Sequence, residues 1–273
     1  MNDSMRSKGR SNVRTFTESK GFLTLLLVAA FAWSIFTTDW SGPLVHPGGT
    51  TSIGQFLRAL FSPELSSSFL KVALVASWQT VAYAVAGITL AVIIGLPLGV
   101  VASGVLSRSV WRRRSSILGV RFILAFLRSI HELVWAWLFV VAIGLSPMAA
   151  ILALAIPYGG ILGRVYAELL NDVPDEPLKA LRASGCSELK VFFYGRLPMA
   201  LPDMMSYTFY RFECAIRAVV IMSFVGTGGL GFHLLLSMDD LLYSKVWTLL
   251  FFLIALVVVV DMWSSAVRRR LVT

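Results

Sequence analysis

The chain has 273 residues, of which 57% are hydrophobic and only 14% are charged, and its mean hydropathy is +0.77. This composition excludes a water-soluble globule, because too little polar surface remains to cover a core. The formal net charge of +9 does not indicate a nucleic-acid partner, since the basic segments lack the interleaved exposed aromatic residues of a nucleic-acid surface. We therefore expect an all-α integral membrane protein in contact with lipid.

Six apolar segments are long enough to cross a hydrocarbon core of about 30 Å, which takes about 20 helical residues. They cover residues 21–37, 77–104 and 121–143, a segment that ends near 170 after the turn at 144–147, and residues 204–225 and 246–267. The first segment follows a basic tail but has no small-x-small cleavage site, so we expect a retained helix rather than a signal peptide.

The chain thus divides into four predicted parts. They are a cytoplasmic basic tail at 1–20, the first transmembrane helix at 21–38, an external loop at 39–76, and a core of five transmembrane helices at 77–273 with a cytoplasmic loop at 171–203. Within the external loop, residues 53–61 fit either a short amphipathic helix on the outer surface or an ordinary loop.

Lys and Arg gather in the N-terminal tail, between the second and third segments, in the polar loop at 171–203 and at the C-terminus. With six crossings, all these groups lie on one side, and the other side has only Arg58, Lys71 and Lys245. The positive-inside rule then predicts that both termini and the polar loop are cytoplasmic.

The second segment has small residues four apart on one face, and the fourth has a shorter row of the same kind. They are Gly87, Ala91, Gly95, Gly99 and Ser103 in the second segment, and Gly159, Gly163 and Ala167 in the fourth. In lipid, such rows allow helix backbones to approach closely, so they predict tight helix packing.

Ionisable residues inside membrane segments are costly and therefore informative. The third segment holds Arg128, His131 and Glu132, and the fifth holds Arg211, Glu213 and Arg217. Arg128 with Glu132, and Glu213 with Arg217, are four residues apart and can pair on one helix face. These residues either hold helices together, with Arg128 reaching the interface, or line a hydrated path that they gate or in which they meet an anionic substrate.

Residues 226–231 read Gly-Thr-Gly-Gly-Leu-Gly and match a dinucleotide fingerprint by letters alone. They follow a membrane helix rather than a strand, so a tight external turn is expected instead. The sequence has no phosphate-binding P-loop, and Cys186 and Cys214 have no metal-ligand spacing. We expect no cofactor or metal on this chain, and energy for any transport has to come from a partner.

The polar loop contains Lys179-Ala180-Leu181, Gly185, and a downstream Leu197-Pro198. From Asp175 to Lys190, acidic residues come early and a basic residue late, as in a short helix. A short helix in this place is either a docking device for a cytoplasmic protein or part of a solvated loop.

This spacing resembles the EAA loop of bacterial ABC-importer permeases, which docks the permease onto its ATPase. Two further blocks, Arg128 to Trp135 and Phe212 to Ala218, resemble the phosphonate and phosphite subgroup of these permeases. The resemblance runs from about Gln79 to the C-terminus. It implies a type I importer permease (MetI-like) fold in the bacterial inner membrane and a role in importing phosphonate, phosphite or a related phosphorus oxyanion.

The resemblance also implies partners: a second copy of this chain, a cytoplasmic P-loop ATPase dimer that carries ATP and Mg²⁺, and an external or periplasmic solute-binding protein. The coupling residues it implies are Lys179, Ala180, Leu181, Gly185, Leu197 and Pro198. Arg128, His131, Glu132, Glu213 and Arg217 are the candidates for the translocation path or its gating.

Two positions depart from the usual loop, since Lys179 replaces a glutamate and Gly195 an isoleucine. Glu176 or Glu188 could substitute as the ion-pair partner of the ATPase. Other functions also stay open: a permease for another small solute such as an amino acid, a passive channel, and a membrane enzyme built on His131, Glu132 and Glu213, which lacks a nucleophile.

Overall fold

The computed structural model describes residues 11–40, 49–106 and 110–272, and every regular element in these ranges is helical. The chain forms two units, residues 1–54 and 55–273. In the first unit, α1 (Ser11–Thr37) begins ten residues before the predicted helix. Residues 1–10 of the predicted basic tail lie outside the described residues.

Three helices are long and apolar enough to span a membrane among the described residues, namely Ser67–Ser103, Pro147–Asp172 and Tyr243–Arg270. Two bent pairs raise this number to five if each pair is one span: Ile117–Ser129 with Glu132–Ile143, and Glu188–Val225 with Leu230–Asp239. The apolar helix Gly21–Thr37 is shorter than these spans. The prediction of six spans is therefore not confirmed.

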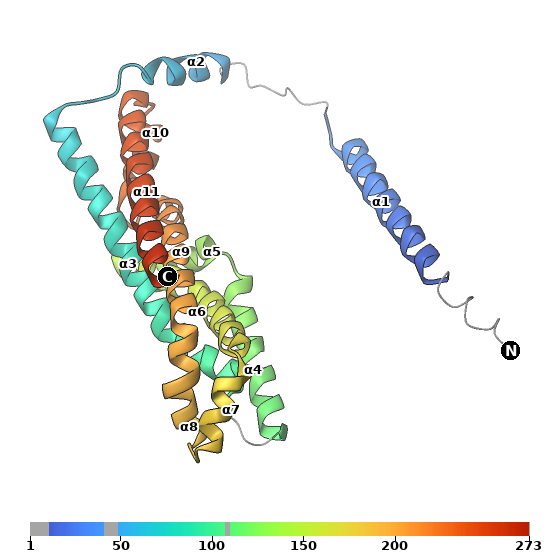
Figure 1. Ribbon diagram of the computed structural model, residues 1–273. Coiled ribbons are helices and arrows are strands. Elements are labelled where there is room, and N and C mark those ends of the chain that lie inside the picture. Colours follow the sequence, from blue (N-terminus) through green and yellow to red (C-terminus); the bar gives the residue numbers. More distant parts are fainter. Residues whose placement is uncertain (1–10, 41–48, 107–109, 273) are drawn as a thin grey trace. The chain divides into compact units, whose positions relative to one another are not determined.

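The core of the second unit is the contact between α3 (Ser67–Ser103) and α6 (Pro147–Asp172), which lie side by side in Figure 1. A Cβ atom on Gly95 would lie 2.9 Å from the Gly159 carbonyl oxygen, and one on Gly99 would lie 2.8 Å from that of Gly163. Side chains at these positions would force the backbones apart. The predicted small-residue packing is confirmed.

The third predicted span, 121–143, is wrong as a single helix. The structure has α4 (Val110–Ser129) and α5 (Glu132–Ile143), and the described parts of the two helices meet at a bend of 84°. His131 between them is extended, and its Nδ1 accepts a hydrogen bond from the Leu133 amide at 3.2 Å. This bond caps α5 and satisfies an amide that has no partner in a new helix, so the chain begins a second helix here.

The polar loop folds into α7 (Asp175–Ala183), α8 (Glu188–Val191) and a π-helical turn (Phe192–Arg196) that continues into α9 (Leu197–Met222). α9 thus begins seven residues before the predicted Met204. Pro198 has no amide hydrogen to donate and stands at the second position of α9, directly after the π-helical turn. In Figure 1, α7 and α8 lie together at the lower end of α9.

The glycine-rich segment forms a turn, as predicted. After the short 3₁₀ helix Ser223–Val225, three glycines have positive φ: Gly226 at 99°, Gly228 at 94° and Gly229 at 87°. α10 (Leu230–Asp239) follows, and the Leu230 amide donates to Thr80 Oγ1 on α3 at 3.0 Å. Glycine is required here for the backbone turn and not for a phosphate.

α2 (Gly49–Ala59) occupies part of the segment for which a surface helix was one of two expectations. Its Phe56 ring contacts Trp247 of α11 (Tyr243–Val272), with ring centroids 4.9 Å apart, and Trp247 Nε1 donates to the Phe56 carbonyl at 2.7 Å. α3 begins at Ser67, ten residues before the predicted second span at Ser77, so the predicted loop is shorter than expected.

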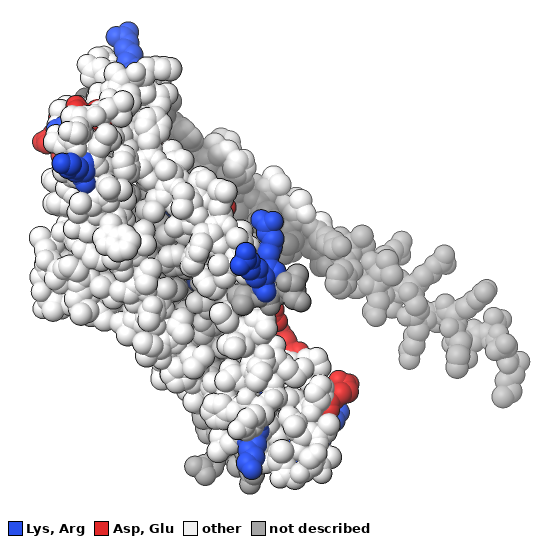
Figure 2. Space-filling model, turned by 60° about the vertical axis from the view of Figure 1, so that its left-hand side comes forward, with Lys and Arg blue, Asp and Glu red and all other residues white. Residues whose placement is uncertain are grey.

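Charged side chains form a few separate groups on the face shown in Figure 2, and most of the surface between them carries none. Large apolar side chains such as Trp78, Trp137 and Val141 are exposed. A lipid environment satisfies such a surface, whereas water does not.

Candidate functional site

α7 is amphipathic, and its two faces have different surroundings. Leu178 is fully buried and Leu181 is half-buried, whereas Lys179 and Ala180 are exposed. The helix therefore packs on its own chain through leucines and presents small and basic residues outward. Such an outward face is available to a partner protein.

Gly195 explains how closely α7 packs. A Cβ atom at Gly195 would lie 2.8 Å from Leu181 Cδ1 and 2.9 Å from Leu178 Cδ2. The two leucines thus occupy the space that the usual isoleucine of the related loops would fill. The departure at this position is compensated within the chain.

Polar contacts connect α7 to the long helices on both sides. Arg196 Nη1 donates to the Leu170 carbonyl at 2.6 Å, and Arg196 Nη2 lies 3.8 Å from Asp175 Oδ1. A single guanidinium therefore joins the end of α6 and the start of α7 to the start of α9. A displacement of α7 can therefore be transmitted directly to α6 and α9.

Glu188 also has a partner within the chain. Arg182 Nε and Nη2 donate to its two carboxylate oxygens at 3.1 and 3.3 Å. This bidentate pair crosses the turn between α7 and α8 and closes the loop on itself. Of the two predicted substitutes for the missing glutamate, Glu188 is thus engaged, whereas Glu176 is exposed on the first turn of α7.

Gly185 follows α7 with φ +81°, and a Cβ atom there would meet nothing within 4 Å. Its amide donates to the Arg182 carbonyl at 3.0 Å and ends the helix. The left-handed backbone, and not crowding, requires glycine at this position. Leu197 is half-buried and Pro198 is exposed at the start of α9.

The two predicted intrahelical ion pairs are wrong. The break before α5 separates Arg128 from Glu132, and the nitrogen found near the Glu132 carboxylate is His131 Nε2, 3.8 Å from Oε2. Glu213 Oε1 accepts instead from Arg268 of α11 at 2.8 Å. Arg217 is exposed, with Nη2 3.6 Å from Cys214 Sγ.

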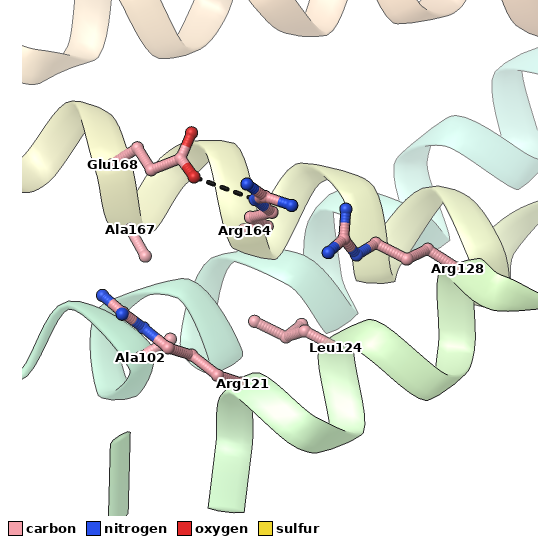
Figure 3. A pocket seen from close by; sticks show the side chains of 7 residues that line it. All are labelled: Ala102, Arg121, Leu124, Arg128, Arg164, Ala167 and Glu168. Atoms are coloured by element: carbon pink, nitrogen blue, oxygen red, sulfur yellow. Dashed lines mark hydrogen bonds and ion pairs between the residues drawn. The ribbon is translucent and has the colours of Figure 1, made fainter. Parts of the chain in front are cut away.

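Arg128 lies at two cavities that the described residues form between α3, α4, α6 and α9. One has a volume of about 240 Å³ and the other about 430 Å³. Both are lined by Arg128, Arg164 and Glu168; Arg121 lines the first and Arg211 the second. Figure 3 shows Arg121 and Arg128 extending from α4 toward α6, where Glu168 accepts from Arg164 Nε at 2.8 Å.

Arg211 extends this basic group from α9. Its guanidinium carbon lies 5.3 Å from the centre of the Tyr158 ring and 5.8 Å from that of Tyr207. Cation–π contacts of this kind hold the guanidinium in place. Its Nε is buried and has no hydrogen-bond partner among the described residues.

Sequence reasoning did not select Arg164, Glu168 and Arg121, and it noted Arg211 without giving it a role. The signal was present in Arg164 and Glu168, which stand four apart inside an otherwise apolar segment. That Arg164 and Glu168 line the same cavities as Arg128 and Arg211 depends on how three helices pack, and no short sequence pattern predicts it. No group of His, Cys, Asp and Glu that could hold a metal occurs in the described part of the chain.

Residues 95–273 match the family described as the binding-protein-dependent transport system inner membrane component, and the chain belongs to this family. It is the permease subunit of a binding-protein-dependent ABC importer, a non-catalytic, multi-pass component of the inner membrane. Such an importer works with an ATPase and a binding protein.

Among its relatives is HtxC of Stutzerimonas stutzeri, whose name places it in a phosphite transport system. The two are 31% identical over 255 residues, which cover 93% of this chain and 86% of HtxC. The phosphite transport system permease protein PtxC of the same organism is 32% identical over 70% of this chain and 68% of its own length. The phosphate-import permease protein PhnE of Mycolicibacterium smegmatis is 27% identical over 81% of this chain and 40% of its own.

Solved structures show the same fold. The chain matches an inward-facing structure of the MetNI methionine ABC transporter with a TM-score of 0.68 and 22% identity, over 76% of this chain and 99% of the other. An amino acid ABC transporter gives a TM-score of 0.63 at 15% identity, over 74% and 95%. The expected MetI-type permease fold is confirmed, while identities this low say nothing of the substrate.

Proposed function

We propose that this chain is the permease of an ATP-driven importer for phosphonate, phosphite or a related phosphorus oxyanion. The observation that carries the proposal is the 31% identity to a phosphite-system permease over 93% of the chain. The group of arginines at the cavities between α4, α6 and α9 supports it, because guanidinium matches oxyanions in charge and in hydrogen-bond geometry.

The working assembly is a homodimer of this chain with two cytoplasmic ATPase subunits and an external solute-binding protein. ATP and Mg²⁺ bind the ATPases, whose closure moves α7. Both termini and α7 face the cytoplasm, in keeping with the distribution of Lys and Arg.

Coupling runs through the exposed face of α7, which includes Lys179 and Ala180, and through the turn at Gly185. Leu181 packs against Gly195, and Arg196 bonds to the end of α6. Motion of α7 therefore reaches α6 and α9, the two helices that carry Arg164 and Arg211. Leu197 and Pro198 begin α9 and move with it.

Arg128 is the earlier candidate that we retain for the translocation path, because it lines both cavities. His131 and Glu132 form the bend between α4 and α5, a place where gating motion can occur. Glu213 holds α9 to α11 and has a packing role in this proposal, and Arg217 lies one turn further along α9.

The test is to purify the tagged chain from native membranes in mild detergent and to identify its partners by mass spectrometry. Recovery of a P-loop ATPase and an external binding protein is expected, and the purified binding protein should bind phosphite or an alkylphosphonate. If the binding protein binds an amino acid and no phosphorus oxyanion, the proposed substrate is wrong and the importer carries an amino acid. Recovery of the chain alone, where other ABC complexes survive, would favour a channel.

A further inference from the structure

Three arginines from three different helices converge on the cavities between α4, α6 and α9. Arg128 comes from α4, Arg164 from α6 and Arg211 from α9. Arg164 and Arg128 line both cavities, and Arg211 lines the larger one with Tyr207. Each of the three helices thus contributes one arginine to the lining of these cavities, although the three residues are far apart in sequence.

Positive charge at this place exceeds negative charge. Four guanidinium groups, of Arg121, Arg128, Arg164 and Arg211, face the carboxylate of Glu168 alone among the cavity-lining residues. Glu168 pairs with Arg164, and the described ion pairs include none for Arg128 or Arg211. Arg121, Arg128 and Arg164 are exposed on the described chain, and positive charge within the membrane-spanning region is expensive unless an anion or water meets it.

Arg211 is the most constrained of the three. Tyr158 and Tyr207 lie within 6 Å of its guanidinium, and its buried Nε is unpaired. A buried donor without a partner costs free energy, and a ligand acceptor removes that cost. Arg211 thus keeps one hydrogen-bond donor without a partner among the described residues.

Glu168 has a different place in the cavity. Its carboxylate lies 2.8 Å from Arg164 Nε, and both side chains are about half-exposed, at 55% and 51%. An exposed pair of this kind is weak and is easily exchanged for a better acceptor. Glu168 can therefore stay paired with Arg164 while no ligand is bound, and the pair can break when an anion binds to Arg164.

We propose that Arg128, Arg164 and Arg211 form a binding station for a tetrahedral phosphorus oxyanion between α4, α6 and α9, and that Glu168 is its built-in competing anion. This proposal rests on the proposed function and names the residues that meet the substrate inside the membrane domain. A lipid phosphate headgroup has the same chemistry, so the test separates the two sources.

The experiment uses the full chain in nanodiscs of phosphatidylcholine and measures binding of ³³P-labelled inorganic phosphate, with unlabelled phosphite and methylphosphonate as competitors. Arg164→Gln and Arg211→Gln should each weaken binding about ten- to a hundredfold, the loss of one charge-assisted hydrogen bond. Glu168→Gln should strengthen it, because Arg164 is freed. Arg58→Gln, a change on α2 away from the cavities, is the matched control and should bind as the wild type does.

Each variant is first compared with the wild type by size-exclusion profile, and Arg164→Lys keeps the charge if Arg164→Gln fails to fold. Equal binding by the wild type and both Gln variants, or no binding by the wild type, overturns the station. The same measurement in phosphatidylglycerol nanodiscs identifies a headgroup site. If that lipid abolishes phosphate binding and is retained on delipidation by the wild type but not by Arg164→Gln, the site belongs to lipid and the substrate role is wrong.

Uptake by the reconstituted importer separates this proposal from the proposed function. If phosphite uptake persists in Arg164→Gln and Arg211→Gln, the proposed binding station is wrong and the proposed transport function still holds. If the wild type takes up an amino acid and no phosphorus oxyanion, the proposed transport function itself is wrong.

Discussion

Glu213 and Arg268 form an ion pair in which Nη2 lies 2.8 Å from Oε1, and it joins α9 to α11 across 55 residues of sequence. The side chains are 10% and 25% exposed, and the same nitrogen donates to Ser265 Oγ at 3.1 Å. Glu213 is sixteen residues after the start of α9 rather than the nine expected from a helix starting at Met204. Its partner comes from the basic C-terminal segment and not from its own helix.

Glu213→Gln should lower the thermal stability of the detergent-solubilised chain by about 1–3 kcal/mol, because Arg268 loses a charged acceptor at a largely buried site. Arg268→Gln should cost a similar amount, and the double variant less than the sum. Uptake per folded molecule should stay near the wild-type level. A large loss of uptake in a fully stable Glu213→Gln protein would restore this residue to the translocation path.

Gly195→Ile places the usual residue of related loops beneath α7 and should uncouple the permease. The added side chain meets Leu181 and Leu178, and overpacking of this kind costs about 1–3 kcal/mol. Gly195→Ala should be mild, since only the flexible ends of the two leucines need to shift. ATPase co-purification and uptake measure the effect.

Leu181→Ala combined with Gly195→Ile supplies the control for crowding. Removing the leucine makes room, so the double variant should recover ATPase binding relative to Gly195→Ile alone. Additive losses in the double variant would show that Gly195 is needed for a reason other than the space taken by Leu181.

Gly185→Val should leave membrane insertion intact and weaken ATPase association, because a β-branched residue at φ +81° distorts the turn after α7. Gly185→Asn is the matched variant, since asparagine tolerates left-handed backbone far better. Both side chains point into open space on this chain. If both variants fail equally, the partner needs a bare backbone at this position, and if neither fails, the turn is not part of the docking surface.

Gly231→Ala should destabilise the chain more than Gly195→Ala or Gly119→Ala does. A Cβ atom at Gly231 would overlap the Val220 carbonyl oxygen, which belongs to rigid helix backbone. Gly119→Ala in α4 is the control, because its Cβ meets nothing within 4 Å and alanine favours a helix by about 0.5–1 kcal/mol. Thermal unfolding of both proteins in one detergent tests this, and equal melting temperatures would contradict the close packing of α10 on α9.

Local patterns were enough to predict some of the fold. The row from Gly87 to Ser103 predicted that this helix packs tightly on another, because close approach in lipid needs small residues at four-residue spacing, and the structure shows that the partner is α6. The break at His131 was missed because most residues from Arg121 to Ile143 are apolar, and a hydropathy average does not show that the His131 side chain caps a new helix. The ion pairs were missed because spacing shows which residues can meet on one helix, not which partner another helix supplies.

The sequence by itself determined that the chain is a membrane protein, that a polar segment interrupts its apolar segments within 171–203, and that the glycines at 226–229 form a turn. Each of these features follows from composition or from short-range spacing, because it depends on residues that are close together in the sequence. Only the tertiary structure decided that Gly195 lies beneath Leu181, that Glu213 meets Arg268, and that Arg128, Arg164 and Arg211 line shared cavities. These contacts join residues 14 to 83 positions apart, and helix packing brings them together through side-chain shapes that no local pattern encodes.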